Sequence, residues 1–251
     1  MAMSKPGILF IHGFPFDHAM WRHQVAALAD RTCLAPDLQG AGSASAPASP
    51  DAYSMAVYAR DLIALLDERG IDSAVVCGLS MGGYVTFELL RKFPTRVRAA
   101  ILCNTKSAAD AAEVKRGRDA LAEKARSKGA NAVAEELVPK ALSRTTLERN
   151  PAVVRDVRSM IERQQVDGIV GALHALRERP DSTPLLDKIR VPVLVVAGSD
   201  DQITPAAGMR EMARAIPGAE FSLIQDAGHL SPLEQPGAFN SALRGFLAKL
   251  L

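Results

Sequence analysis

The sequence predicts an α/β fold, with a mostly parallel, doubly wound sheet of about six strands. Short aliphatic and β-branched runs alternate along the chain with longer segments in which apolar residues recur at helical spacing. Strands joined through helices pair in parallel, because antiparallel neighbours need only a short turn between them. The runs are apolar throughout, which is typical of strands that are covered on both faces.

The predicted strands are apolar runs closed by Gly, Pro or polar residues: residues 8–11, 32–35, 73–77, 97–103, 191–197 and 220–224. The predicted helices around them are residues 20–29, 55–69, 84–93 and 206–215, with a last helix from about 236 to the C-terminus. Ser54 is the expected N-cap of the second helix, and Gly70 its stop. Trp21 either packs the first helix onto the sheet or lies near a pocket entrance with His18.

Residues 106–187 differ from the rest of the chain, since they are rich in Ala, Arg, Lys and Glu and contain no convincing strand. Helical spacing is present in residues 111–128, 130–141, 151–164 and 168–179. These segments could be the sheet's own crossover helices, but four in succession are too many for one crossover. The predicted domains are therefore a core, residues 1–105 and 188–251, and an inserted four-helix cap, residues 106–187.

Composition and charge exclude several classes of protein. A net charge of +2 over 251 residues gives no support for nucleic-acid or membrane binding. Cys33, Cys77 and Cys103 lie in apolar runs without C-x-x-C spacing, so we expect buried thiols in a reducing compartment. The cysteines and the five histidines show no ligand spacing, so we expect no metal. The apolar run at residues 8–11 is too short for a signal or membrane segment, so a cytoplasmic protein is expected.

The segment Gly78-Leu79-Ser80-Met81-Gly82 lies between a β-branched run and a helix-like stretch. This G-x-S-x-G pattern in a strand–turn–helix context is typical of a nucleophile elbow. The turn is so tight that Gly78 and Gly82 have little room for side chains. Such a turn exposes the Ser80 hydroxyl above a helix N-terminus, where free N–H groups can stabilise an oxyanion. An ordinary serine in a Gly-rich turn is the alternative.

A serine nucleophile needs a base, and the base needs an orienting acid. Only His174 and His229 follow Ser80 in the chain, and His174 lies in a helical Ala/Leu stretch. His229 lies in a loop after the last strand, at the edge where reactive groups gather in parallel sheets, so it is the predicted base. Asp200 and Asp201 both follow the strand at residues 191–197. Local physical chemistry does not separate them, since either could instead cap the next helix.

Taken together, these motifs resemble those of the α/β-hydrolase family. They are His12-Gly13-Phe14, Asp37-x-x-Gly40-x-Gly42, Gly78-x-Ser80-x-Gly82-Gly83, Gly198-x-x-Asp201-x-x-x-Pro205 and Gly228-His229, in family order. The resemblance selects Asp201 as the triad acid. It also implies a sheet that begins at the family's third strand, and thus a shortened member without the N-terminal hairpin.

Two backbone N–H groups are expected to face the oxyanion. One belongs to Met81, directly after the nucleophile. The other, by resemblance, belongs to Phe14, while Pro15 has no N–H and cannot serve.

Within the family the chain is most similar to small capped carboxylesterases and 3-oxoadipate enol-lactonases. It departs from the lactonases at Gln39, where they carry arginine in Asp-x-Arg-Gly-x-Gly. The resemblance implies a cofactor-free serine hydrolase that cleaves a small, largely apolar ester or lactone, with Phe14, Met81 and Leu230 beside the catalytic groups. The alternatives are C–C bond hydrolysis or perhydrolysis on the same residues, and a small-molecule receptor that retains the triad. The oligomeric state is left open.

Overall fold

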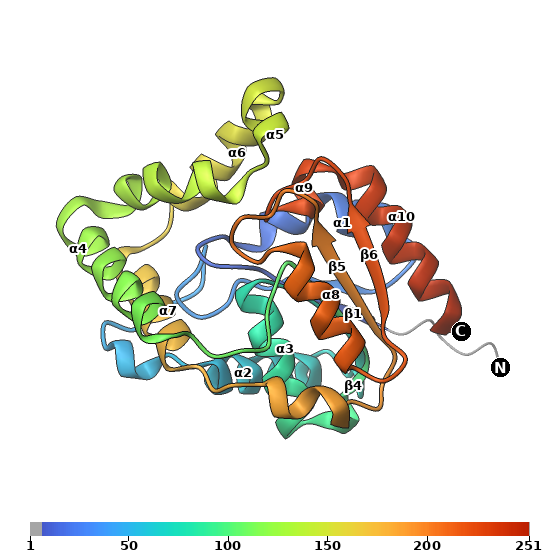
Figure 1. The fold of residues 1–251 in the computed structure, drawn as a ribbon. Coiled ribbons are helices and arrows are strands. Elements are labelled where there is room, and N and C mark those ends of the chain that lie inside the picture. Colours follow the sequence, from blue (N-terminus) through green and yellow to red (C-terminus); the bar gives the residue numbers. More distant parts are fainter. Residues whose placement is uncertain (1–6, 251) are drawn as a thin grey trace.

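The computed structural model describes residues 7–250, so residues 1–6 of the predicted core and the terminal Leu251 lie outside the described part. One sheet contains β1 (Gly7–Ile11), β2 (Cys33–Leu34), β3 (Ala74–Leu79), β4 (Val97–Cys103), β5 (Val193–Gly198) and β6 (Glu220–Ile224). Their order is β2-β1-β3-β4-β5-β6 and every pairing is parallel (Figure 1). The predicted fold class is confirmed.

Helices cover both faces of the sheet (Figure 1). On one face lie α1 (Arg22–Ala27) and α10 (Pro236–Leu247); on the other lie α2 (Met55–Glu68), α3 (Met81–Lys92) and α8 (Ala206–Ala215). Successive β1 residues point to opposite faces: Phe10 packs into the hydrophobic core under α1 and α10, and Ile11 packs into the core under α2, α3 and α8. Burial on both faces explains why the strands read as unbroken apolar runs.

Trp21 packs the first helix onto the sheet. Its side chain is fully buried, with its ring centroid 5.0 Å from that of Phe10 and 6.1 Å from that of Phe239. The sequence left open whether Trp21 lies in the core or near a pocket entrance, and in the structure it lies in the core. His18 is exposed, and its Nδ1 lies 2.7 Å from the Asp37 carboxylate.

The ends of α2 follow the sequence signals. Ser54 accepts a hydrogen bond from the Val57 N–H at 3.1 Å, and Gly70 has a φ of 64° directly after the helix. The four-residue α9 (Ser231–Glu234) was not predicted, because so short a helix shows no periodicity. Short 3₁₀ helices are His18–Trp21, Pro50–Ala52, Pro94–Arg96, Thr183–Lys188 and Ala248–Leu250.

Between β4 and β5 the chain forms α4 (Ala112–Ala141), α5 (Arg144–Arg149), α6 (Pro151–Glu162) and α7 (Val166–Glu178), and residues 106–187 contain no strand. We call these residues the helical insertion. The helices predicted at residues 111–128 and 130–141 are two halves of α4, which bends at Gly129, where φ is 76°. The α5 helix was not predicted, although Ser143 caps it by accepting from the Thr146 N–H. In Figure 1 the insertion stands over one end of the sheet.

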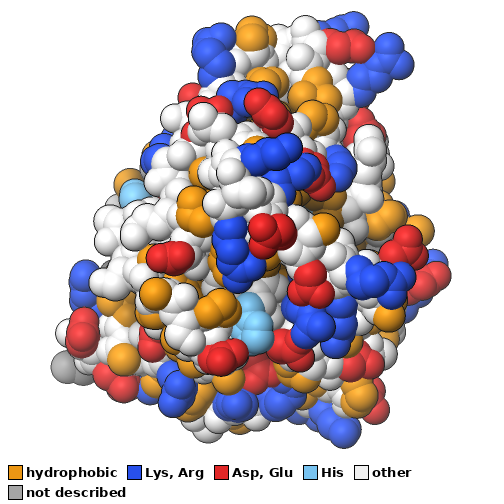
Figure 2. Space-filling model, turned by 90° about the vertical axis from the view of Figure 1, so that its left-hand side faces the viewer, with side chains coloured by type: hydrophobic (Ala, Val, Ile, Leu, Met, Phe, Trp, Pro, Cys, Tyr) orange, Lys and Arg blue, Asp and Glu red, His pale blue; other side chains and the backbone are white. Residues whose placement is uncertain are grey.

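The surface agrees with the weak net charge. Figure 2 shows basic and acidic side chains interspersed over the face that carries α4 and α7. Within residues 7–250, no helix has both the length and the apolar character to cross a bilayer. Cys77 and Cys103 are buried free thiols, as expected, with their sulfurs 3.8 Å apart; Cys33 is partly buried.

Candidate active site

Four polar side chains follow neighbouring strands at one edge of the sheet. Ser80 follows β3, Asn104 follows β4, Asp201 lies beyond β5 and His229 lies beyond β6. Because these strands are parallel and adjacent, their carboxyl ends meet at the same edge, where ligands of open α/β sheets bind.

The turn at Ser80 is strained and closely packed. Ser80 has a φ of 54° and a ψ of −110°, a conformation that costs about 1–3 kcal/mol and is held only by its surroundings. Its N–H donates to the Cys103 carbonyl at 2.9 Å, and its carbonyl accepts from Thr105 Oγ1 at 2.8 Å. A Cβ on Gly78 would lie 2.2 Å from the Gly82 oxygen, so the first glycine of the motif has no room for a side chain.

The His229 imidazole is held by Asp201. Nδ1 of His229 lies 2.9 Å from Oδ2 of Asp201, and both residues are at most 5% exposed. The other carboxylate oxygen accepts from the N–H groups of Ile203 at 2.8 Å and Thr204 at 3.0 Å. Asp200 is exposed and accepts a hydrogen bond from Ser199 Oγ instead. The structure therefore distinguishes the two aspartates, which local physical chemistry did not. His174 lies on α7, and its Nε2 is 3.6 Å from the Asp51 carboxylate.

The Asp201 carboxylate is ionised at neutral pH. Burial alone would raise its pKa, but the facing His229 and the hydrogen bonds from His229, Thr204 and Asn104 outweigh burial and hold the pKa well below its usual range. The carboxylate can therefore orient the imidazole and stabilise its protonated form.

Asn104 is a site residue to which sequence reasoning gave no role. It is completely buried, and its Nδ2 donates to Oδ2 of Asp201 at 2.8 Å and to the Gly228 carbonyl at 3.2 Å. Ser231 Oγ donates to its Oδ1 at 2.6 Å, which fixes the orientation of the amide. Its place directly after a central strand is the signal that could have identified it.

Ser80 and His229 share a cavity of about 110 Å³. Its other lining residues come from the 12–16 loop, α3, α4, α7 and the loop after β5: Phe14, Phe16, Tyr84, Arg118, Leu121, Leu137, Ala141, Leu176 and Ile203. The helical insertion thus supplies much of the wall opposite the serine. Arg118 pairs with the buried Asp110, which also pairs with Arg179 and Lys106.

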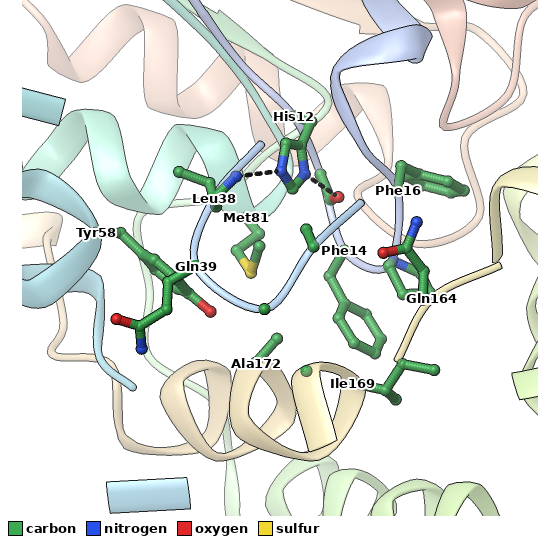
Figure 3. A pocket seen from close by; sticks show the side chains of 15 residues that line it. His12, Phe14, Phe16, Leu38, Gln39, Tyr58, Met81, Gln164, Ile169 and Ala172 are labelled. Carbon is green, nitrogen blue, oxygen red and sulfur yellow. Dashed lines mark hydrogen bonds between the residues drawn. The ribbon is translucent and has the colours of Figure 1, made fainter. Parts of the chain in front are cut away.

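Phe14 and Met81 lie on the sheet side of the site, next to a smaller cavity of about 20 Å³ (Figure 3). Within residues 7–250 neither backbone N–H has a hydrogen-bond partner. His12 supports this loop: its Nδ1 donates to the Gly13 carbonyl, and its Nε2 accepts from the Leu38 N–H, both at 3.0 Å. Burial lowers the pKa of His12, which keeps it neutral and able to do both.

One group of side chains has metal-ligand character. Asp17, His18 and Asp37 bring one ligand atom each within 4.8 Å of one another. Protein groups already occupy these carboxylates: Arg163 pairs with Asp17, and Ser43 and His18 donate to Asp37. The hydrogen bonds account for the grouping without an ion.

Comparison with known proteins identifies the family of this chain. Residues 6–236 match the model of the alpha/beta hydrolase fold family. A 3-oxoadipate enol-lactonase of Acinetobacter baylyi is 29% identical over 98% of this chain and 90% of its own. The structure of an esterase from Thermogutta terrifontis is 38% identical, with a TM-score of 0.93 over 98% of this chain and 91% of that one. An enol-lactonase from Burkholderia xenovorans is 32% identical, with a TM-score of 0.90 over 98% and 92%. This chain is therefore a hydrolase and a member of the alpha/beta hydrolase family.

Proposed function

We propose that this hydrolase cleaves a carboxylic ester or lactone through an acyl-serine intermediate. Ser80 is the nucleophile, His229 the general base and Asp201 the orienting acid. The observation that carries the proposal is the hydrogen bond between His229 Nδ1 and Asp201, beside a cavity that both His229 and the strained Ser80 line. The esterase and the enol-lactonases among its relatives support the same chemistry.

In the first half-reaction, His229 takes the Ser80 proton while Oγ attacks the carbonyl carbon. Because Asp201 holds Nδ1, Nε2 is the nitrogen that takes this proton and later gives it to the leaving oxygen. Water then repeats the sequence on the acyl-serine, with His229 again as base. Asp201 stays ionised throughout and stabilises the imidazolium.

The oxyanion is stabilised by backbone donors. The Met81 N–H lies at the N-terminus of α3, where the helix dipole also favours negative charge. The Phe14 N–H is the second donor. Loss of one such donor costs about 3 kcal/mol of transition-state stabilisation.

The helical insertion acts as the cap of this site. Apolar side chains from α4 and α7 face Ser80 across the cavity, which favours a small, largely apolar acyl or alkoxy group. With Gln39 at the position where lactonases carry arginine, and with a cavity lined mostly by apolar side chains, we expect neutral esters to be accepted. A covered site also excludes water from the acyl-enzyme until the leaving group departs.

Initial rates on p-nitrophenyl esters with acyl chains of two to twelve carbons test the proposal, with wild type and Ser80→Ala compared. Turnover by wild type that disappears in Ser80→Ala supports it, and full activity in Ser80→Ala overturns it. Turnover of β-diketones far above that of any ester or lactone would instead favour C–C hydrolysis on the same residues. Very slow turnover with a large ligand-induced stabilisation would favour a receptor.

A further inference from the structure

Glu234, the last residue of α9, is a buried acid that the proposed mechanism does not use. It is 6% exposed, and its carboxylate accepts three backbone N–H groups. Oε1 accepts from Gly228 at 2.9 Å and from Leu230 at 3.2 Å, while Oε2 accepts from Ser143 at 2.8 Å. One side chain therefore joins two segments that are far apart in the sequence.

The two segments are the histidine loop and the end of α4. Gly228 and Leu230 flank His229, whereas Ser143 follows α4 in the helical insertion. The segments also touch directly: the His229 N–H donates to the Ala141 carbonyl at 2.9 Å. A Cβ on Gly228 would lie 2.6 Å from the Ser143 nitrogen, so only glycine permits this approach.

Both segments also form walls of the catalytic cavity, since His229 and Ala141 line it from opposite sides of this junction. A small shift between the segments would move the imidazole relative to a bound acyl group. A displacement of about 1 Å at a reacting group costs about 100-fold in rate.

The electrostatics of Glu234 also indicate a role in the site. Burial raises its pKa, and hydrogen bonds from Ser143, Thr146 and Gly228 counter this only in part. A carboxyl whose pKa is raised by folding lowers the stability of the fold at pH values above its ordinary pKa. The buried carboxyl group is therefore retained at a cost to stability, which is expected of a group that serves the site.

We propose that Glu234 is a positioning residue that fixes the His229 loop against the end of α4, so that the imidazole and the insertion keep one relative position. This inference rests on the proposed serine-hydrolase function. It assigns to Glu234 the task of holding backbone and not of contacting substrate.

Glu234→Gln tests the inference, because the amide keeps the shape but turns an NH₂ group toward an N–H donor. We expect kcat on p-nitrophenyl butyrate to fall about 10- to 100-fold, with KM changed less than about threefold. Amide hydrogen exchange is expected to accelerate in residues 141–143 and 226–230 and nowhere else. Glu234→Asp retains a carboxyl group and should recover part of the loss. Glu123→Gln, an exposed site on α4, is the matched control and should behave as wild type.

The outcomes separate the two proposals. Absence of ester turnover and of phosphonate labelling at Ser80 in wild type would overturn the proposed function, while hydrogen exchange would still decide whether Glu234 joins the segments. An active wild type with wild-type kcat and exchange in Glu234→Gln overturns the role of Glu234. A lower kcat accompanied by faster hydrogen exchange throughout the chain would also overturn it, since this result indicates a general loss of packing. Where Glu234→Gln does not fold, the same comparison applies to Glu234→Asp.

Discussion

The side-chain amide of Asn104 donates to the same carboxylate oxygen of Asp201 that His229 contacts. Thr204 Oγ1 donates to that oxygen as well, at 2.6 Å. The oxygen is thus surrounded by donors from three different loops, and the Asp201 side chain has little freedom to rotate away from the imidazole.

Asn104→Gly is expected to lower both stability and activity. Glycine tolerates the φ of 43° at this position but removes the donor to Asp201. A hydrogen bond to a charged group contributes about 1.5–3 kcal/mol. We expect a loss of this size in urea unfolding, together with a reduced kcat. Ser231→Ala removes only the bond that orients the amide, so its effects should be smaller. Equal effects of the two substitutions would contradict this account.

Ser80, His229 and Asp201 are expected to act as a unit. Ser80→Ala should lower kcat by several orders of magnitude, and His229→Ala added to it should cost little more, because triad effects are strongly non-additive. Steady-state rates of the single and double variants check this. Independent, multiplying losses would mean that the three residues do not serve one step.

Ile203 is expected to limit the length of the acyl or alkoxy chain. Its side chain lines the catalytic cavity and also an adjacent groove of about 380 Å³, formed mainly by α8 and residues 105–108. Ile203→Ala should join the two spaces and move the optimum of the p-nitrophenyl ester series to longer chains. Val114→Ala, at another exposed apolar residue, is the control and should keep the wild-type optimum. An unchanged optimum in Ile203→Ala would mean that the acyl or alkoxy chain of the substrate does not extend toward Ile203.

The helical insertion is expected to depend on Gly168 but not on Gly117. A Cβ on Gly168 would lie 1.8 Å from the Gly40 carbonyl oxygen, so Gly168→Ala must push α7 away from the loop beside the proposed oxyanion donors. A Cβ on Gly117 of α4 meets nothing within 4 Å, and alanine there should stabilise the helix by up to about 1 kcal/mol. The midpoint of thermal unfolding should therefore fall in Gly168→Ala and rise in Gly117→Ala. A Gly168→Ala variant as stable as wild type would contradict the close packing.

Stability is expected to fall as pH drops below 6.5, in part because of His12. Its pKa is lowered by burial, so below the ordinary value of 6.5 the unfolded chain binds a proton that the folded chain does not. The contribution of His12 to the free energy of unfolding is fully present above pH 6.5 and decreases as the pH falls toward the pKa of His12 in the folded state. His12→Asn should show a smaller loss in urea unfolding between pH 7.5 and 5.5. An identical loss in both proteins would assign it to other groups.

The sequence predicted the sheet, its flanking helices and the positions of Ser80 and His229 at the carboxyl edge of the sheet, because each has a local signature. Ser80 lies in a glycine-framed turn, and His229 follows a strand in a glycine loop. These signals depend on backbone sterics and on strand direction, which neighbouring residues determine.

Glu234 had no comparable signature, and the place of Asn104 directly after a strand does not reveal what its side chain contacts. The partner of Asn104 lies 97 residues away, and Glu234 meets Ser143 across 91 residues. Their roles arise from tertiary contacts between loops that no local periodicity records. The short α5 and α9 were missed for a related reason, since four to six residues are too few to show helical spacing.

The helical insertion leaves the sheet after β4 and returns at β5, and these two strands are hydrogen-bonded neighbours, with Ala100 opposite Val193. Near its two ends the inserted segment is held together directly, since the Ser182 N–H donates to the Ser107 carbonyl at 2.9 Å. The stretch between these residues can therefore be exchanged without changing the register of any strand. A protein built in this way can acquire a new substrate range by replacing one contiguous stretch of chain while the loops bearing Ser80 and Asp201 stay in place. The histidine loop is the exception, because a grafted segment would also have to present an N–H group to Glu234.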